Sequence, residues 1–181
     1  MEYAFQKSLS GREIKNIRIR LGMTKKELAE FVNVSPKTVE RWEGSTAPVS
    51  GPITVLLKII SERPQLIEAL ALPSENEYPM RLKYMHGNDL CTVIDVDEAR
   101  RRIRIKNFTD DYLCCAFGKN NQPEFSEYEA FLESRCFPRE RDKMKLMLKE
   151  LNLPFYDPMM IIEKTNGRMD EDDFWIDIKK N

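Results

Sequence analysis

Residues 22–44 read GMTKKELAEFVNVSPKTVERWEG and contain the start signals of two short helices. Thr24, followed three residues later by Glu27, is a capping-box pattern, so a helix is expected to begin there. Ser35 and Pro36 mark a second start, because serine accepts hydrogen bonds from free N–H groups and proline fits the first turn. The stretch therefore predicts two short helices joined by a tight turn, which is a helix-turn-helix.

The second of these helices, expected over residues 36–43 and stopped at Gly44, has two unlike faces. Val39 and Trp42 are three residues apart and share the face that packs inward. A helix of two turns depends on such packing, which leaves its polar face free to contact a ligand. Because an α-helix fits the major groove of DNA, this polar face predicts base reading. The expected base-reading residues are Lys37, Thr38 and Arg41.

Phosphate contacts are expected from side chains and helix N-terminal N–H groups around the same motif. The residues placed for this role are Thr24, Lys25, Ser35 and Ser45. The alternative is that Lys37 and Arg41 form only a solvated helix face, which is the simpler interpretation of either residue alone. The caps, the turn and the glycine together favour DNA reading.

Apolar residues at helical spacing predict further helices on both sides of the motif. One is expected over about residues 11–21, one over about residues 51–62 and one from residue 64 onward. Each has an apolar face that needs a partner, so the helices are expected to share one core. The sequence thus predicts an all-α N-terminal domain of about five helices over residues 1–72.

The motif resembles the helix-turn-helix of the Cro/phage-repressor (XRE) family, and the resemblance covers about residues 11–72. The matching positions are Thr24, Glu27, Leu28, Ala29, Val34, Ser35, Val39, Trp42, Glu43 and Gly44. The resemblance implies a transcriptional repressor that binds double-stranded operator DNA. Lys25 departs from the family, in which many members carry a glutamine that touches a phosphate or base. A lysine can still bind a phosphate, but as a point charge. A homodimer is expected, because one recognition helix reads too few base pairs.

The chain changes character after residue 72. Residues 73–79, PSENEYP, are polar with a proline at each end, which predicts a linker. Beyond the linker, alternating apolar residues predict antiparallel strands, and helical spacing returns from residue 124. The expected strands cover residues 80–85, 91–96, 103–106 and, at the end of the chain, 174–178. Residues 80–181 therefore predict a small α+β domain with an antiparallel sheet, which binds a partner or dimerises.

Three charged segments of this second domain invite a function. Residues 100–106 form a basic strand that either touches DNA phosphates or blunts a solvated sheet edge, and the edge is the simpler interpretation. Residues 170–173 are acidic and lie before two large aromatic residues. They lack the spacing of a calcium loop, so a solvated turn is favoured. Residues 135–142 alternate in charge and are expected to form a surface ion-pair network.

Composition limits the classes of function. The 181 residues have a net charge of −1, but residues 1–72 carry 11 Lys or Arg and 8 Asp or Glu, whereas residues 73–181 carry 18 and 22. The basic excess in residues 1–72 and the acidic excess in residues 73–181 suggest that the two parts bind separate partners. The four cysteines include no C-x-x-C pair and the chain has one histidine, which argues against a structural zinc site. Adjacent Cys114 and Cys115 are expected to be buried apolar residues.

The chain shows no signal-peptide pattern and no apolar run of the roughly 18 residues that a membrane helix needs. We therefore expect a cytoplasmic protein without membrane contact. It lacks the motifs of nucleophilic hydrolases and a phosphate-binding glycine loop, so no catalytic residue, metal or cofactor is expected.

The segments LESRCFPRERDKMKL, LPFYDP and GRMDEDDFWI are similar to a region of small bacterial proteins associated with HipA-like kinase toxins. That resemblance covers about residues 80–178. It implies an antitoxin whose C-terminal domain binds the toxin while the front domain represses their shared promoter. Two alternatives stay open: a repressor whose second domain binds a small ligand or only dimerises, and a DNA-targeted enzyme that uses clustered carboxylates.

Overall fold

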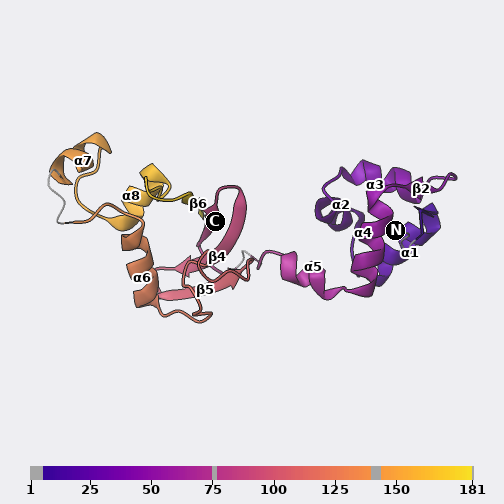
Figure 1. Cartoon of the computed structure of the whole chain (residues 1–181), viewed down its shortest axis with the longest axis horizontal. Helices are drawn as coiled ribbons and strands as arrows, with labels where there is room; N and C mark the ends of the chain where they lie inside the picture. Colours follow the sequence, from indigo (N-terminus) through magenta and orange to yellow (C-terminus); the bar gives the residue numbers. More distant parts are fainter. Residues whose placement is uncertain (1–5, 75–76, 140–143, 181) are drawn as a thin grey trace. The chain divides into compact units, whose positions relative to one another are not determined.

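The computed structural model describes residues 6–74, 77–139 and 144–180. The chain divides into two compact units, residues 1–71 and 72–181, and each has its own hydrophobic core (Figure 1). Part of the expected linker, residues 75 and 76, lies outside the described residues. The same is true of residues 140–142 in the charge-alternating segment.

The described residues of the N-terminal unit form five helices, as the sequence predicts. They are α1 (Gly11–Arg20), α2 (Lys25–Phe31), α3 (Pro36–Glu43), α4 (Pro52–Glu62) and α5 (Gln65–Leu70). The expected caps of α2 and α3 are both present, and α1 adds a further capping box at Ser10. A two-residue antiparallel pair, β1 (Ser8–Leu9) with β2 (Val49–Ser50), was not anticipated. It joins the segment before α1 to the segment before α4.

The core of this unit is built from one apolar face of each of the first four helices. Ile14 of α1, Leu28 and Ala29 of α2, Val39 of α3 and Leu57 of α4 are fully buried. The small side chain of Ala29 lies in the same core, and α2 packs against α3. The helix-turn-helix is therefore held in place by α1 and α4 and does not rely on its own short helices.

The C-terminal unit is an α+β structure around one antiparallel sheet. Its strands are β3 (Met80–His86), β4 (Asp89–Asp97), β5 (Arg102–Asn107) and β6 (Phe174–Lys180), in the order β5-β4-β3-β6. The expected meander is confirmed, and the closing strand pairs with β3, with Leu82 opposite Ile178. The last strand thus lies beside the first, and β5 is an edge strand.

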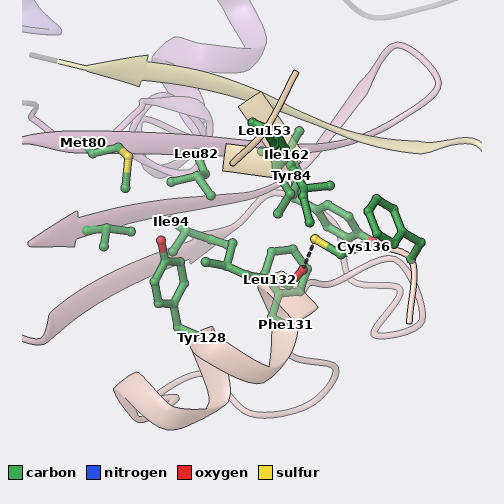
Figure 2. Close-up of a cluster of buried hydrophobic side chains, with 14 of the residues drawn as sticks. Met80, Leu82, Tyr84, Ile94, Tyr128, Phe131, Leu132, Cys136, Leu153 and Ile162 are labelled. Carbon is green, nitrogen blue, oxygen red and sulfur yellow. Dashed lines mark hydrogen bonds between the residues drawn. The ribbon is translucent and has the colours of Figure 1, made fainter. Parts of the chain in front are cut away.

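Three helices follow β5: α6 (Phe125–Ser134), α7 (Met144–Glu150) and α8 (Pro158–Thr165). Their apolar residues meet one face of the sheet, as Figure 2 shows for Tyr128, Phe131 and Leu132 of α6 below Leu82 and Ile94. Cys136 lies in this core and donates its S–H to the carbonyl of Leu132 at 3.3 Å. The inner face of α6 is therefore packed against the sheet, and its other face is left toward the surface.

The other face of the sheet is polar yet partly covered. Arg81 is 1% exposed and makes a bidentate contact with Asp95, with Nε–Oδ1 at 2.6 Å. Arg104 of β5 reaches the same carboxylate at 2.8 Å. The segment before β3 lies over these residues, because Arg81 binds the carbonyl of Pro73 and Arg104 binds that of Ser74. Arg104 of the basic segment 100–106 is thus committed to internal contacts.

Two expectations about charged and sulfur-containing residues need correction. Arg135 does not belong to a surface network: it is 6% exposed and donates to the Gly167 carbonyl and to Asp172. Local charge alternation could not reveal these partners, which are more than 30 residues away in sequence. Cys114 and Cys115 are only partly buried, in the irregular segment after β5.

Candidate nucleic-acid interface

The helix-turn-helix owes its shape to short-range hydrogen bonds at its two helix starts. Thr24 and Glu27 form a reciprocal capping box, with the Thr24 N–H 2.6 Å from Glu27 Oε2 and the Glu27 N–H 3.2 Å from Thr24 Oγ1. The Thr24 backbone N–H and, to a lesser degree, its hydroxyl lower the pKa of Glu27, because both favour the ionised carboxylate. At the second start the N–H of Thr38 lies 3.2 Å from Ser35 Oγ. The turn between the helices passes through Asn33, which adopts a left-handed φ of 55°.

Burial decides which face of α3 is available. Val39 is fully buried and Trp42 is half-buried against the same core. The opposite side of α3 is exposed, including Lys37 and Arg41, while Thr38 is partly covered. Since both inward residues are anchored, α3 cannot turn about its axis without losing apolar burial. The polar face is thereby held in a fixed direction.

A buried ion pair fixes the far end of α3. Arg18 of α1 contacts Glu43 through Nε–Oε1 at 2.6 Å and Nη2–Oε2 at 3.2 Å. The same guanidinium donates to the carbonyl of Met23 at 2.8 Å, in the loop before α2. The side chains are only 11% and 5% exposed, and the pKa of Arg18 is raised by its bonds to Glu43. One arginine thus joins α1, the loop before α2 and the end of α3.

A close backbone approach supports the same end of the helix. Gly11, at the start of α1, is buried, and a Cβ placed on it would lie 2.6 Å from the carbonyl oxygens of both Trp42 and Glu43. No side chain larger than hydrogen fits that space without a backbone shift. Gly11 therefore lets α1 meet the C-terminal end of α3 directly.

The three expected base-reading residues lie together on the exposed side of α3. In the part of the chain that the structure describes, no hydrogen bond or ion pair engages Lys37 or Arg41. Thr38 shares a hydrogen bond of 2.9 Å with the hydroxyl of Ser35. A shallow hollow on this face is lined by Ser35, Lys37, Thr38, Glu40 and Arg41. The helix thus presents two uncommitted cations and two hydroxyls beside one carboxylate.

The four residues expected to contact phosphates differ in whether their hydrogen-bond donors and charges are already engaged within the protein. The Thr24 hydroxyl accepts the Glu27 N–H and also bonds to the Glu27 carboxylate. Ser35 accepts the Thr38 N–H and keeps its own proton to donate where the Thr38 hydroxyl is the donor of their shared bond. Lys25 is half-exposed and lies 3.6 Å from Glu40, a contact that solvent screens. Ser45 donates to the carbonyl of Ala47 at 2.7 Å, and its N–H donates to Trp42. Ser45 has therefore committed both of its donors.

Sequence reasoning missed the residues that position α3. Arg18 and Glu43 are 25 residues apart, and no local pattern announces a pair at that separation. Glu43 matches the family pattern, and Gly11 begins the helix expected over residues 11–21. Neither pattern predicts the contact between α1 and the end of α3. The one available signal was an arginine on the partly buried side of α1, next to Ile14 and Ile17.

Comparison with known families agrees with this geometry. A family model described as helix-turn-helix matches residues 14–48, which run from α1 through the loop after α3. The match supports the likeness to Cro-type (XRE) repressors and a general role as a DNA-binding regulator of transcription. No curated protein matches the chain. Within the described residues, no helix has the length and apolar character needed to cross a membrane.

Proposed function

We propose that the protein is a sequence-specific repressor that inserts α3 into the major groove of its operator. The observation that carries this proposal is that Lys37 and Arg41 have no hydrogen bond or ion pair among the described residues. They lie on a helix whose opposite face is packed into the core. A charged group already engaged inside the protein must break that contact before it binds DNA. Free side chains on a fixed helix avoid this cost and are held ready for binding.

Roles within the motif follow from the chemistry of each side chain. Arg41 can donate two parallel bonds to the O6 and N7 acceptors of guanine, and Lys37 can reach the same acceptors singly. Thr38 offers a hydroxyl and a methyl group, which suit an adenine edge or a thymine methyl. Thr24, Lys25 and Ser35 hold the phosphates on either side. Ser45 would have to give up its bond to Ala47, so it contributes least.

A homodimer is the second part of the proposal. One helix of this length covers only a few base pairs, and two half-sites about one helical turn apart, ~34 Å, give enough sequence to specify an operator. Leu66 and Leu70 are one turn apart in α5 and are 36% and 64% exposed. An exposed apolar pair on one helix face is suited to pack against a second copy.

The third part concerns the α+β unit, for which we propose an antitoxin role through residues 80–181. In that role the unit binds a toxin protein while the N-terminal unit represses the promoter that both genes share. Expression of the adjacent gene with and without this chain tests the role. Growth arrest that the full chain relieves, together with a stable complex of the two purified proteins, would support it. No complex with the product of either adjacent gene would refute it.

Binding to DNA from upstream of the protein's own gene tests the repressor directly. Fluorescence anisotropy would be recorded at several salt concentrations, with a scrambled duplex of equal length and composition as competitor. A specific complex should form with a two-to-one ratio of protein to site, and its affinity should fall with salt as phosphate contacts release counterions. Equal affinity for the two duplexes at every salt concentration would refute autoregulation by sequence reading.

A further inference from the structure

The C-terminal unit contains a groove of its own. It runs along α6 and is bounded by the turn between β4 and β5 and by the first residues of α8. Its apolar lining comes from Phe125 and Leu132 of α6, the Tyr128 ring and Met159 of α8. A floor of this kind suits the aliphatic or aromatic part of a bound side chain.

The rim of the groove is acidic. Four carboxylates and two arginines line it, and both arginines are already paired. Arg101 makes two bonds of 3.0 Å to Glu129, and Arg139 lies 2.6 Å from Glu133. The two remaining carboxylates, Glu98 and Asp157, have no ion pair among the described residues. The groove thus has two unneutralised negative charges.

Only one oxygen of Asp157 is occupied. Its Oδ1 accepts from the N–H of Met160 at 2.8 Å and caps α8, and Oδ2 of this groove-lining residue has no hydrogen bond among the described residues. Glu98 belongs to the exposed turn after β4, where its backbone carbonyl accepts the Arg101 N–H at 3.2 Å, and its carboxylate has no ion pair among the described residues. Two free carboxylate oxygens beside an apolar floor form a receptor for a cation that carries a hydrocarbon stem.

The hydroxyl of Tyr128, which also lines the groove, is a buried polar group. Tyr128 is 1% exposed, and its hydroxyl is the buried side-chain polar atom that finds no hydrogen-bond partner among the described residues. Burial raises the pKa of Tyr128 most, and the nearby Glu98 carboxylate raises it further through its charge and a side-chain contact, although this contact falls short of full hydrogen-bond geometry. In Figure 2 the ring rises from α6 and its oxygen points toward the strands. A buried hydroxyl without a partner is costly, and an incoming N–H donor would satisfy it.

We propose that this groove is a docking site for a partner protein and that it receives an arginine side chain of that partner between Glu98 and Asp157. A guanidinium has five N–H donors, enough to serve both carboxylates and the Tyr128 oxygen together, whereas an ammonium offers three from one point. The negative rim repels nucleic acid and anionic lipid, so a basic protein segment is the fitting occupant. The proposal deepens the partner-binding role of residues 80–181 and is independent of DNA binding.

The test uses the full chain labelled with ¹⁵N and two capped pentapeptides that differ only in their central residue, arginine or norleucine. The arginine peptide should shift the amide resonances of α6, of the β4–β5 turn and of Asp157, and the norleucine peptide should leave them unchanged. In the double variant Glu98→Gln, Asp157→Asn the dissociation constant should rise about tenfold, because two charge-assisted bonds are lost. Asparagine keeps the cap of α8, so the fold is preserved.

Three comparisons make the result decisive. Glu171→Gln removes one negative charge from an exposed turn outside the groove and should leave peptide affinity unchanged. Tyr128→Phe should weaken the arginine peptide without loss of folding. Spermidine distinguishes a small polyamine site from a peptide site. Equal shifts with both peptides, no effect of the double variant, or tighter binding of spermidine than of the arginine peptide would each overturn the proposal, whatever the outcome of the DNA measurements.

Discussion

Arg18 and Glu43 form a bidentate, largely buried ion pair that joins α1 to the last turn of α3, with Nε 2.6 Å from Oε1. Because the same guanidinium binds the carbonyl of Met23, the pair closes the helix-turn-helix against α1 at a point opposite its polar face. The direction in which Lys37 and Arg41 point therefore depends on two residues whose own side chains are largely buried.

Glu43→Ala should destabilise the N-terminal unit strongly. Removing one partner of a buried pair leaves an uncompensated charge, at a cost of about 3 kcal/mol. Glu40→Ala is the matched control, because its contact with Lys25 is exposed and is worth less than about 1 kcal/mol. Urea unfolding followed by Trp42 fluorescence, in a Trp175→Phe background, measures this unit alone. Equal effects of the two substitutions would contradict the structural role of the pair.

Gly11→Ala should also destabilise the N-terminal unit. The new methyl group would meet two backbone carbonyl oxygens at 2.6 Å, so α1 or the end of α3 must move, at a cost of about 1–3 kcal/mol. Gly44→Ala provides the comparison, since its Cβ would lie 3.3 Å from a single carbonyl and its φ is −90°, which alanine adopts readily. The same fluorescence assay applies. An alanine at position 11 that is tolerated as well as one at position 44 would show that the helices are not in close contact.

Local signals in the sequence predicted the elements well and their long-range contacts poorly. The Thr24–Glu27 box and the start at Ser35 depend on residues three apart, so the bounds of α3 were predicted correctly. The acidic partners of Arg18 and Arg135 lie 25 or more residues away, and the burial of both arginines follows from the fold. The sequence did not predict the buried ion pair between Arg81 and Asp95 on the covered outer face of the sheet, for the same reason. In alternating sequence, buried and exposed arginines look alike.

The C-terminal unit should lose stability in acid through Asp172. The bonds from Arg135 lower the pKa of this carboxyl below its ordinary value. A lowered folded-state pKa contributes stability that is complete above the unfolded value, about 3.9, and is lost as the pH falls through the folded value. Asp172→Asn should remove that part of the pH dependence, and Asp173→Asn should not. Trp175 fluorescence in a Trp42→Phe background reports the transition, and identical acid profiles for the two variants would contradict the assignment.

Tyr128→Phe should leave the C-terminal unit as stable as before or more stable, by about 1 kcal/mol, because it removes a buried hydroxyl that meets no hydrogen-bond partner among the described residues. Tyr156→Phe is the opposite case. Its hydroxyl donates to the carbonyl of Phe137 at 2.9 Å, so losing it should cost about 1 kcal/mol. Urea titration of both variants shows directly whether each substitution raises or lowers the free energy of unfolding. A loss of stability in Tyr128→Phe as large as that in Tyr156→Phe would mean that the hydroxyl is satisfied within the fold.

The central claim is that α3 reads bases, and the affinity of Arg41→Ala for specific and scrambled DNA tests it most directly. Arg63→Ala, which removes an exposed arginine just beyond α4, is the matched control for net charge. Anisotropy titrations at fixed salt should show that Arg41→Ala loses about 1–3 kcal/mol on the operator and much less on scrambled DNA, whereas Arg63→Ala matches the wild type. If Arg41→Ala and Arg63→Ala weaken both duplexes equally, the arginine on α3 contributes only charge, and the base-reading account is wrong.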